Sequence, residues 1–220
     1  MRGDELVRAL CAGEHPAPDS AAVDLLEQVF AGYPVDRLRP LLRDERDSVV
    51  RAGAWITAEL GERAVLLLDD VRPLLRHTSR YVRFFALDAV LAAATSEHVD
   101  LLTEAVGLIE DPDEAVRWKA VGLLSRASTT QLAAAAGGRH GDLLRQLTAP
   151  DERQVISGLT ADSRTARLFA AAAAVRLAPE HPAALDAALR AADPDVSSFA
   201  AEHARLMALS SRRTRRGKKR

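Results

Sequence analysis

The stretch "DEAVRWKAVG", residues 113–122, decides the fold because the chain repeats its pattern twice more. A Val-Arg pair, followed by alanine three positions after the arginine, also occurs in "DSVVRAGAWI", residues 47–56, and in "SRYVRFFALD", residues 79–88. The arginines of the three copies are 32 and 34 positions apart. Self-similarity at a period of about 20 to 50 residues is typical of a protein built by stacking one supersecondary unit.

Each copy predicts a helix, a tight turn and a second helix. An amphipathic segment comes before every Val-Arg pair, at residues 35–44, 68–77 and 99–111. The pair itself opens a run in which apolar residues recur at helical spacing. An alanine stands three positions after each arginine, where a small side chain lets neighbouring helices approach closely: Ala54, Ala86 and Ala120.

Two weaker copies follow. Residues 161–177 place Arg167 at the arginine position, whereas residues 193–209 keep an Asp-Pro-Asp turn and lose the arginine. The intervening stretch "AAAAGGRHGD", residues 133–142, contains glycines that break a helix, so we expect an irregular or shortened pair there. Asp113 and Asp195 each follow a proline in a turn and are expected to cap the second helix.

These units resemble HEAT repeats and their variants called PBS-lyase HEAT-like repeats, in which an Asp-containing turn joins an apolar first helix to a second helix that opens with Val-Arg. The resemblance covers residues 35–125 well and residues 150–210 loosely. It implies an all-α fold, an α-solenoid of about five to six helical pairs whose second helices line a concave face. We expect one such domain over residues 1–211 and a disordered basic tail over residues 212–220.

The resemblance also implies that the acid of each turn pairs with the arginine. Asp111 and Arg117 fit that spacing, and Glu45 and Arg51 fit it with a conservative change. His77 replaces the acid in the remaining copy, which interrupts the expected ladder of acids and arginines.

Composition and motifs limit the kinds of site that the chain is expected to contain. The single Cys11 forms no internal disulfide and, with no secretory signal pattern, favours a reducing cytoplasm. The longest apolar run, residues 168–175, is far shorter than the roughly 20 residues that cross a bilayer, so no membrane partner is expected. The six histidines lie at no metal-ligand spacing, and "GGRHGD" lacks the phosphate-loop pattern. We therefore expect no catalytic, cofactor-binding or metal-binding residues, with Cys11 in the core.

The arginine positions leave two readings open. Four guanidiniums at one repeat position line a groove for an acidic partner, or each is tied to its own turn acid or to a neighbouring carbonyl group; we favour the second interpretation. The residues directly after two of these arginines are aromatic and are the best anchors for a partner. The candidate partner-binding residues are Arg51, Trp55, Arg83, Phe84, Arg117, Trp118 and Arg167.

The last nine residues are strongly basic. The seven cations leave a formal net charge of −8 on residues 1–211, so an acidic body carries a cationic arm. Such an arm provides salt-sensitive contact with nucleic acid or an acidic surface, and nucleic acid is expected to bind through the tail only. The candidate contact residues are Arg212, Arg213, Arg215, Arg216, Lys218, Lys219 and Arg220.

The sequence favours a non-catalytic scaffold or adaptor that binds a protein partner through the concave face of its repeats. An inhibitor or immunity-type protein is one form of this function, since an acidic surface complements a basic target. The alternative is an enzyme resembling the HEAT-like alkylpurine DNA glycosylases, or another nucleic-acid-binding protein. That alternative requires a basic groove with aromatic residues and a catalytic acid.

Overall fold

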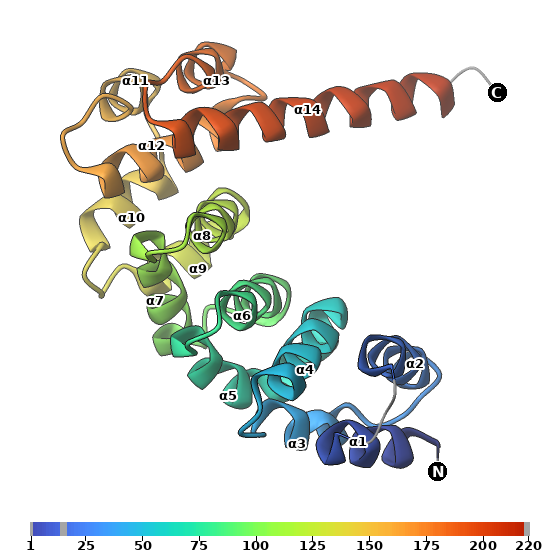
Figure 1. The fold of residues 1–220 in the computed structure, drawn as a ribbon. Helices are drawn as coiled ribbons and strands as arrows, with labels where there is room; N and C mark the ends of the chain where they lie inside the picture. The colour runs from blue at the N-terminus through green and yellow to red at the C-terminus, as the bar shows by residue number, and fades with distance from the viewer. Residues whose placement is uncertain (1, 14–16, 218–220) are drawn as a thin grey trace. The chain divides into compact units, whose positions relative to one another are not determined.

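The computed structural model describes residues 2–13 and 17–217, and the regular structure of these residues is entirely helical. The chain divides into two compact units, residues 1–108 and residues 109–220. Within each unit the helices follow one another as pairs (Figure 1). The all-α prediction is confirmed, while the boundary of a single domain at residue 211 stays a prediction.

The first unit contains first helices that are broken into short pieces and second helices that are continuous. The first helices are α1 (Arg2–Ala12), the 3₁₀ segment η1 (Val35–Leu38) with α3 (Arg39–Leu42), the segments η2 (Gly61–Leu67), α5 (Leu68–Val71) and η3 (Arg72–Arg76), and α7 (Val99–Gly107). The second helices are α2 (Pro18–Phe30), α4 (Asp47–Glu59) and α6 (Arg80–Ala93). A 3₁₀ turn η4 (Leu108–Glu110) follows α7.

Two prolines explain why these first helices are broken. Pro40 lies in the first turn of α3, and Pro73 lies in the first turn of η3. Proline has no backbone N–H for the bond to the fourth residue before it, so one helical turn ends and another begins there.

Successive first helices of this unit are joined by a ladder of ion pairs. Arg39 and Arg43, one helical turn apart, both contact the buried carboxylate of Asp70. One repeat later, Arg72 and Arg76 contact Glu104, with Nη2–Oε distances of 2.6 and 3.2 Å. The repeating Arg-Pro-Leu-Leu-Arg pattern thus sets each first helix in register with the next.

The closest approach between a first and a second helix occurs at Gly53. A Cβ atom at this position would lie 2.8 Å from Cβ of Leu41 and 3.1 Å from its carbonyl carbon. The predicted small residues are also confirmed as packing residues, since Ala54 and Ala86 are buried here and Ala120 is buried in the second unit. The helices therefore stack at distances that only small side chains permit.

Gly53→Ala is expected to lower the free energy of unfolding by about 1–3 kcal/mol, because the added methyl group overlaps the backbone and Cβ of Leu41. The matched control is Gly107→Ala, where a Cβ atom meets nothing within 4 Å, and which should be neutral or stabilising by at most about 1 kcal/mol. Urea unfolding followed by circular dichroism measures both. Equal stability of the two variants would contradict the close approach.

The second unit begins with the second helix of the third repeat and contains three further pairs. The elements are α8 (Glu114–Arg126), α9 (Thr129–Ala135), α10 (Gly141–Thr148), α11 (Glu152–Gly158), α12 (Arg164–Leu177), α13 (Pro182–Leu189) and α14 (Pro194–Gly217). The shortened pair predicted around residues 133–142 is present as α9 and α10, with Gly137 and Gly138 in the turn between them and Gly141 at the start of α10.

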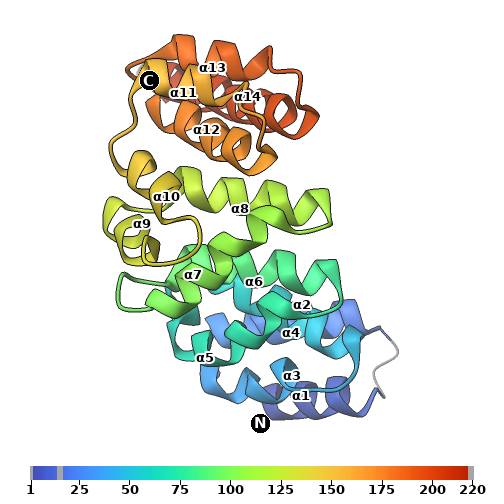
Figure 2. The same ribbon diagram turned by 90° about the vertical axis from the view of Figure 1, so that its left-hand side faces the viewer.

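Helix α12 is the centre of the second unit. Residues 168–175, the longest apolar run of the sequence, are all buried in it, as expected of a helix that is apolar on every side. Figure 2 shows α12 next to α8, α11, α13 and α14, and its Arg176 donates to the carbonyl oxygens of Leu124, Ser125 and Ala127. A cation at the carboxyl end of α8 fits the polarity of that helix terminus.

Helix α14 is longer than the sequence predicts. Its backbone is helical through Gly217, whereas residues 212–217 are expected from the sequence to be disordered. Arginine is a good helix former, which allows an existing helix to continue into this segment. Lys218, Lys219 and Arg220 lie outside the described residues, so the order of the whole tail stays a prediction. Among the described residues, no helix is both long and apolar enough to span a membrane.

Candidate functional site

In three repeats, an arginine side chain holds the preceding turn with the same set of hydrogen bonds. Arg83, Arg117 and Arg167 each use Nη1 to donate two hydrogen bonds to the backbone. In all three, the acceptors are the carbonyl oxygens six and five positions earlier, at 2.8 and 2.9 Å. One side chain thus satisfies two turn carbonyl groups and fixes the second helix against the first.

The carboxylate partners of two of these arginines come from a later turn. Nε of Arg117 donates to Oδ2 of Asp195 at 2.8 Å, and Nε of Arg167 donates to Oδ2 of Asp193 at 2.9 Å. Asp193 consequently has its pKa lowered: burial opposes the shift, and the hydrogen bond from Arg167 outweighs it together with other favourable contacts.

The pairing of Asp111 with Arg117 is therefore different from the one that the resemblance implies. Arg117 binds the carbonyl oxygen of Asp111, while the carboxylate of Asp111 accepts the backbone N–H of Asp113 at 2.9 Å. Because the acceptor is a backbone group, its residue type is free to vary. This explains how His77 replaces the acid in the preceding repeat, where its carbonyl oxygen accepts from Arg83.

The expected caps are confirmed at one turn and wrong at the other. The Asp113 side chain accepts from the backbone of the first turn of α8 and is its N-cap. Helix α14 instead begins at Pro194, so Asp195 lies inside its first turn. There its carboxylate binds the guanidinium groups of Arg117 and Arg164, at 2.8 and 2.6 Å.

Arg83→Lys is expected to lower the free energy of unfolding by about 1–3 kcal/mol, because an ammonium group cannot reproduce both bonds to the turn carbonyl groups. Arg51→Lys, at the equivalent repeat position in the same unit, is the control. Arg51 is exposed and lies 6.0 Å from the Tyr81 ring centroid, so its replacement should change stability by less than about 0.5 kcal/mol. Chemical denaturation of both variants measures the difference, and equal effects would contradict the structural role of Arg83.

A groove of about 500 Å³ lies between α8 and α14 in the second unit. Half-exposed Trp118 and buried Phe199 meet in it as an edge-to-face pair with ring centroids 6.0 Å apart. Exposed Leu206 and Met207 extend this apolar surface along α14. Trp118 also lines a smaller hollow of about 260 Å³ beside Glu114 and Asp195, so the indole borders both.

The walls of this groove carry charged and titratable groups. Lys119 Nζ lies 5.7 Å from the Trp118 ring centroid, and Arg126 lines the same wall of α8. The lining carboxylate, Glu202, is held by Arg205 through two bonds of 2.8 and 2.7 Å. Burial, and then the nearby Arg126 charge, lower the pKa of His203, which keeps this imidazole neutral to a lower pH than an ordinary histidine.

The stability of the second unit should fall as the pH decreases below about 6.5. The pKa values of both His203 and His140 are lowered, chiefly by burial, so the folded chain binds fewer protons than the unfolded chain in this range. The stability is therefore complete above the ordinary histidine pKa and is lost as the pH falls toward the folded-state values. Melting temperatures between pH 8 and 5.5 test this, and replacement of both histidines by glutamine should flatten the dependence. An unchanged slope would contradict the assignment.

The remaining candidates lie in the first unit. Trp55 is half-buried on α4, and Phe84 packs edge-to-face on Phe85 at 5.7 Å on α6. Arg51 is the exposed member of the arginine set. Trp118, Arg117 and Arg167 belong to the second unit.

Phe199 is a groove residue outside the set predicted from the sequence. It stands six positions after Asp193, as Arg117 stands six positions after Asp111. An aromatic residue at the arginine position of the last copy is the signal that could have identified it.

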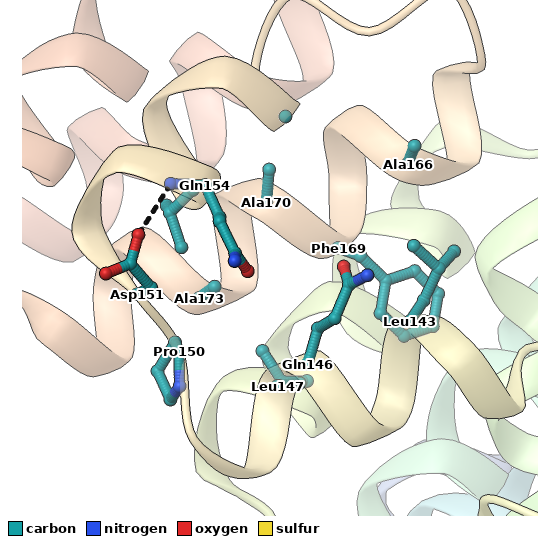
Figure 3. A pocket seen from close by; sticks show the side chains of 12 residues that line it. Leu143, Gln146, Leu147, Pro150, Asp151, Gln154, Ala166, Phe169, Ala170 and Ala173 are labelled. Carbon is teal, nitrogen blue, oxygen red and sulfur yellow. Dashed lines mark hydrogen bonds between the residues drawn. The ribbon is translucent and has the colours of Figure 1, made fainter.

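Other features of the molecule offer little chemistry. A hollow of about 100 Å³ between α10, α11 and α12 is floored by Leu147, Phe169 and Ala173, and Asp151 at its edge caps α11 (Figure 3). Cys11 is half-buried, and burial followed by the Asp44 charge raises its pKa, which opposes a reactive thiolate. Among the described residues, no three His, Cys, Asp or Glu side chains are grouped to hold a metal ion.

Comparison with known proteins identifies the fold. The chain is similar to an engineered protein of known structure, with a TM-score of 0.50 and 19% identity over 91% of this chain and 94% of that one. It is similar to a designed armadillo repeat protein solved in complex with peptide (KR)4, with a TM-score of 0.50 and 19% identity over 92% and 98% of the two chains. An archaeal HEAT-like repeats protein from Thermococcus onnurineus NA1 aligns at 15% identity and a TM-score of 0.48, covering 94% and 97%.

No protein-family model matches the chain, and no curated protein matches it. At this level of identity the structural likeness shows the fold alone, which is a helical repeat of the armadillo and HEAT kind. The predicted α-solenoid class is thereby confirmed.

Proposed function

We propose that the chain is a non-catalytic binding module that holds a segment of a protein partner in the groove between α8 and α14. The observation that carries this proposal is the Trp118 indole, half-exposed and held edge-on by buried Phe199 beside exposed Leu206 and Met207. Rigid aromatic anchors surrounded by apolar surface supply most of the binding energy at protein interfaces. Repeat folds commonly present such surfaces.

The arginine residues divide between two roles in this module. Arg83, Arg117 and Arg167 position the second helices through their turn carbonyl bonds, so their effect on a partner is indirect. Arg51, Trp55 and Phe84 form a second candidate surface in the first unit. The designed armadillo repeat protein solved in complex with peptide (KR)4 supports the idea that this fold accommodates a peptide.

The wider setting follows from the sequence. A reducing cytoplasm is the expected compartment for a chain with a single cysteine. A module without catalytic activity would act as an adaptor or as an inhibitor of a larger protein. The basic residues 212–220 add a second, salt-sensitive contact with nucleic acid or an acidic surface.

Trp118→Ala is expected to weaken binding of a selected peptide about 30-fold or more, since truncation of an interface anchor costs about 2 kcal/mol or more. Peptides are selected from a random display library on the full chain, and their affinities are measured by fluorescence anisotropy. Phe30→Ala is the matched control, because Phe30 is an exposed aromatic residue on α2 outside the candidate set. Trp55→Ala and Phe84→Ala report whether the first unit shares the site.

Circular dichroism of each variant separates lost binding from lost folding. Selected peptides that bind Trp118→Ala and the unaltered chain equally would exclude this groove as the site. Release of bases from alkylated duplex DNA by the full chain would instead support the glycosylase alternative and overturn the non-catalytic assignment.

A further inference from the structure

Helices α8 and α14 each contribute one continuous stripe of residues to the groove. Trp118, Gly122 and Arg126 follow one another at one-turn intervals on α8, opposite His203 and Met207 on α14. A Cβ atom at position 122 would meet only Nη2 of Arg126, at 3.4 Å. The absence of a side chain at Gly122 leaves room in the middle of the groove for the guanidinium group of Arg126, whose Nε donates to the carbonyl oxygen of Gly122 at 3.1 Å.

The charge of the groove is positive. Its lining contains the cations Lys119 and Arg126 and one carboxylate, Glu202, whose charge is offset by the two bonds from Arg205. On the other side of Trp118, the Asp195 carboxylate is compensated by two guanidinium groups, while Glu114 adds one negative charge. The charge thus changes along the groove, and its Arg126 side prefers an anion.

We propose that the groove binds an acidic amphipathic segment of a protein. A bulky apolar side chain of that segment lies between Trp118 and Met207, and its carboxylates face Lys119 and Arg126. The proposal rests on the proposed function and names the partner class of that site. Charge complementarity of this kind selects partners and accelerates their association.

A protein segment fits the groove better than a nucleic acid. The floor formed by Trp118, Phe199, Leu206 and Met207 is largely apolar, which suits aliphatic or aromatic side chains rather than phosphates. Residues 1–108 contain 12 basic and 18 acidic residues, a formal net charge of −6 that opposes a long polyanion.

Three labelled probes test the proposal on the full chain by fluorescence anisotropy. The first is a 15-residue helix-forming peptide with leucine and tryptophan on one face and glutamate on the other. The second has lysine in place of every glutamate, and the third keeps the glutamates and has alanine in place of the apolar residues. We expect the first to bind at least tenfold more tightly than either of the others, and less tightly as the salt concentration rises.

Two kinds of variant separate the steric from the electrostatic contribution to peptide binding. Gly122→Leu fills the middle of the groove, and the double variant Lys119→Glu/Arg126→Glu reverses the charge of its wall. Each variant is expected to lower the affinity for the acidic peptide at least tenfold. Arg153→Glu is the matched charge reversal, on an exposed residue in the first turn of α11 where an acid suits the helix terminus. It should change affinity less than twofold, and circular dichroism confirms folding of all variants.

The outcomes distinguish the partner class from the site. Equal binding of the glutamate and lysine peptides, both abolished by Gly122→Leu, would overturn the acidic partner and retain the groove. Binding of the acidic peptide that Gly122→Leu and the charge reversals leave unchanged would overturn both. Failure of the acidic peptide to bind at about 1 mM, or its displacement by equimolar single-stranded DNA, would also overturn the proposal.

Discussion

The structure depends on the bonds that one arginine side chain makes to the backbone of the turn before it. A turn between two packed helices contains carbonyl groups that the helices themselves do not satisfy. Arg83, Arg117 and Arg167 meet this requirement in the same way, with one nitrogen on two consecutive carbonyl groups. Arginine suits this task because its guanidinium group is planar and keeps further donors for a carboxylate.

The use of backbone acceptors explains why the turns tolerate different sequences. The three acceptor pairs include an aspartate with a proline, a histidine with a threonine, and an alanine with an aspartate. Acidic side chains remain useful for capping, as at Asp113, and for binding an arginine of another turn, as at Asp193 and Asp195. The arginine position is thus the constrained one, and the turn varies around it.

Where the arginine is lost, the helix face becomes available for another use. The last repeat has Phe199 at that position, and this side chain packs against Trp118 instead of holding a turn. The aromatic pair, the missing side chain at Gly122 and the cations of α8 together form the groove to which we assign partner binding.

The sequence by itself determined the helical repeat, because the Val-Arg spacing, the buried alanines and the interrupted segment at residues 133–142 follow from local periodicity and from helix-breaking residues. It also predicted Trp118 as a candidate anchor for a partner and favoured a structural role for the arginines. It did not reveal that α8 packs directly on α12 and borders α14, since these helices are separated in the chain by the short α9–α10 pair. The contact of Phe199 with Trp118 and the pairing of Arg117 with Asp195, 78 positions away, were decided by tertiary packing, because contacts between distant segments leave no period in the sequence.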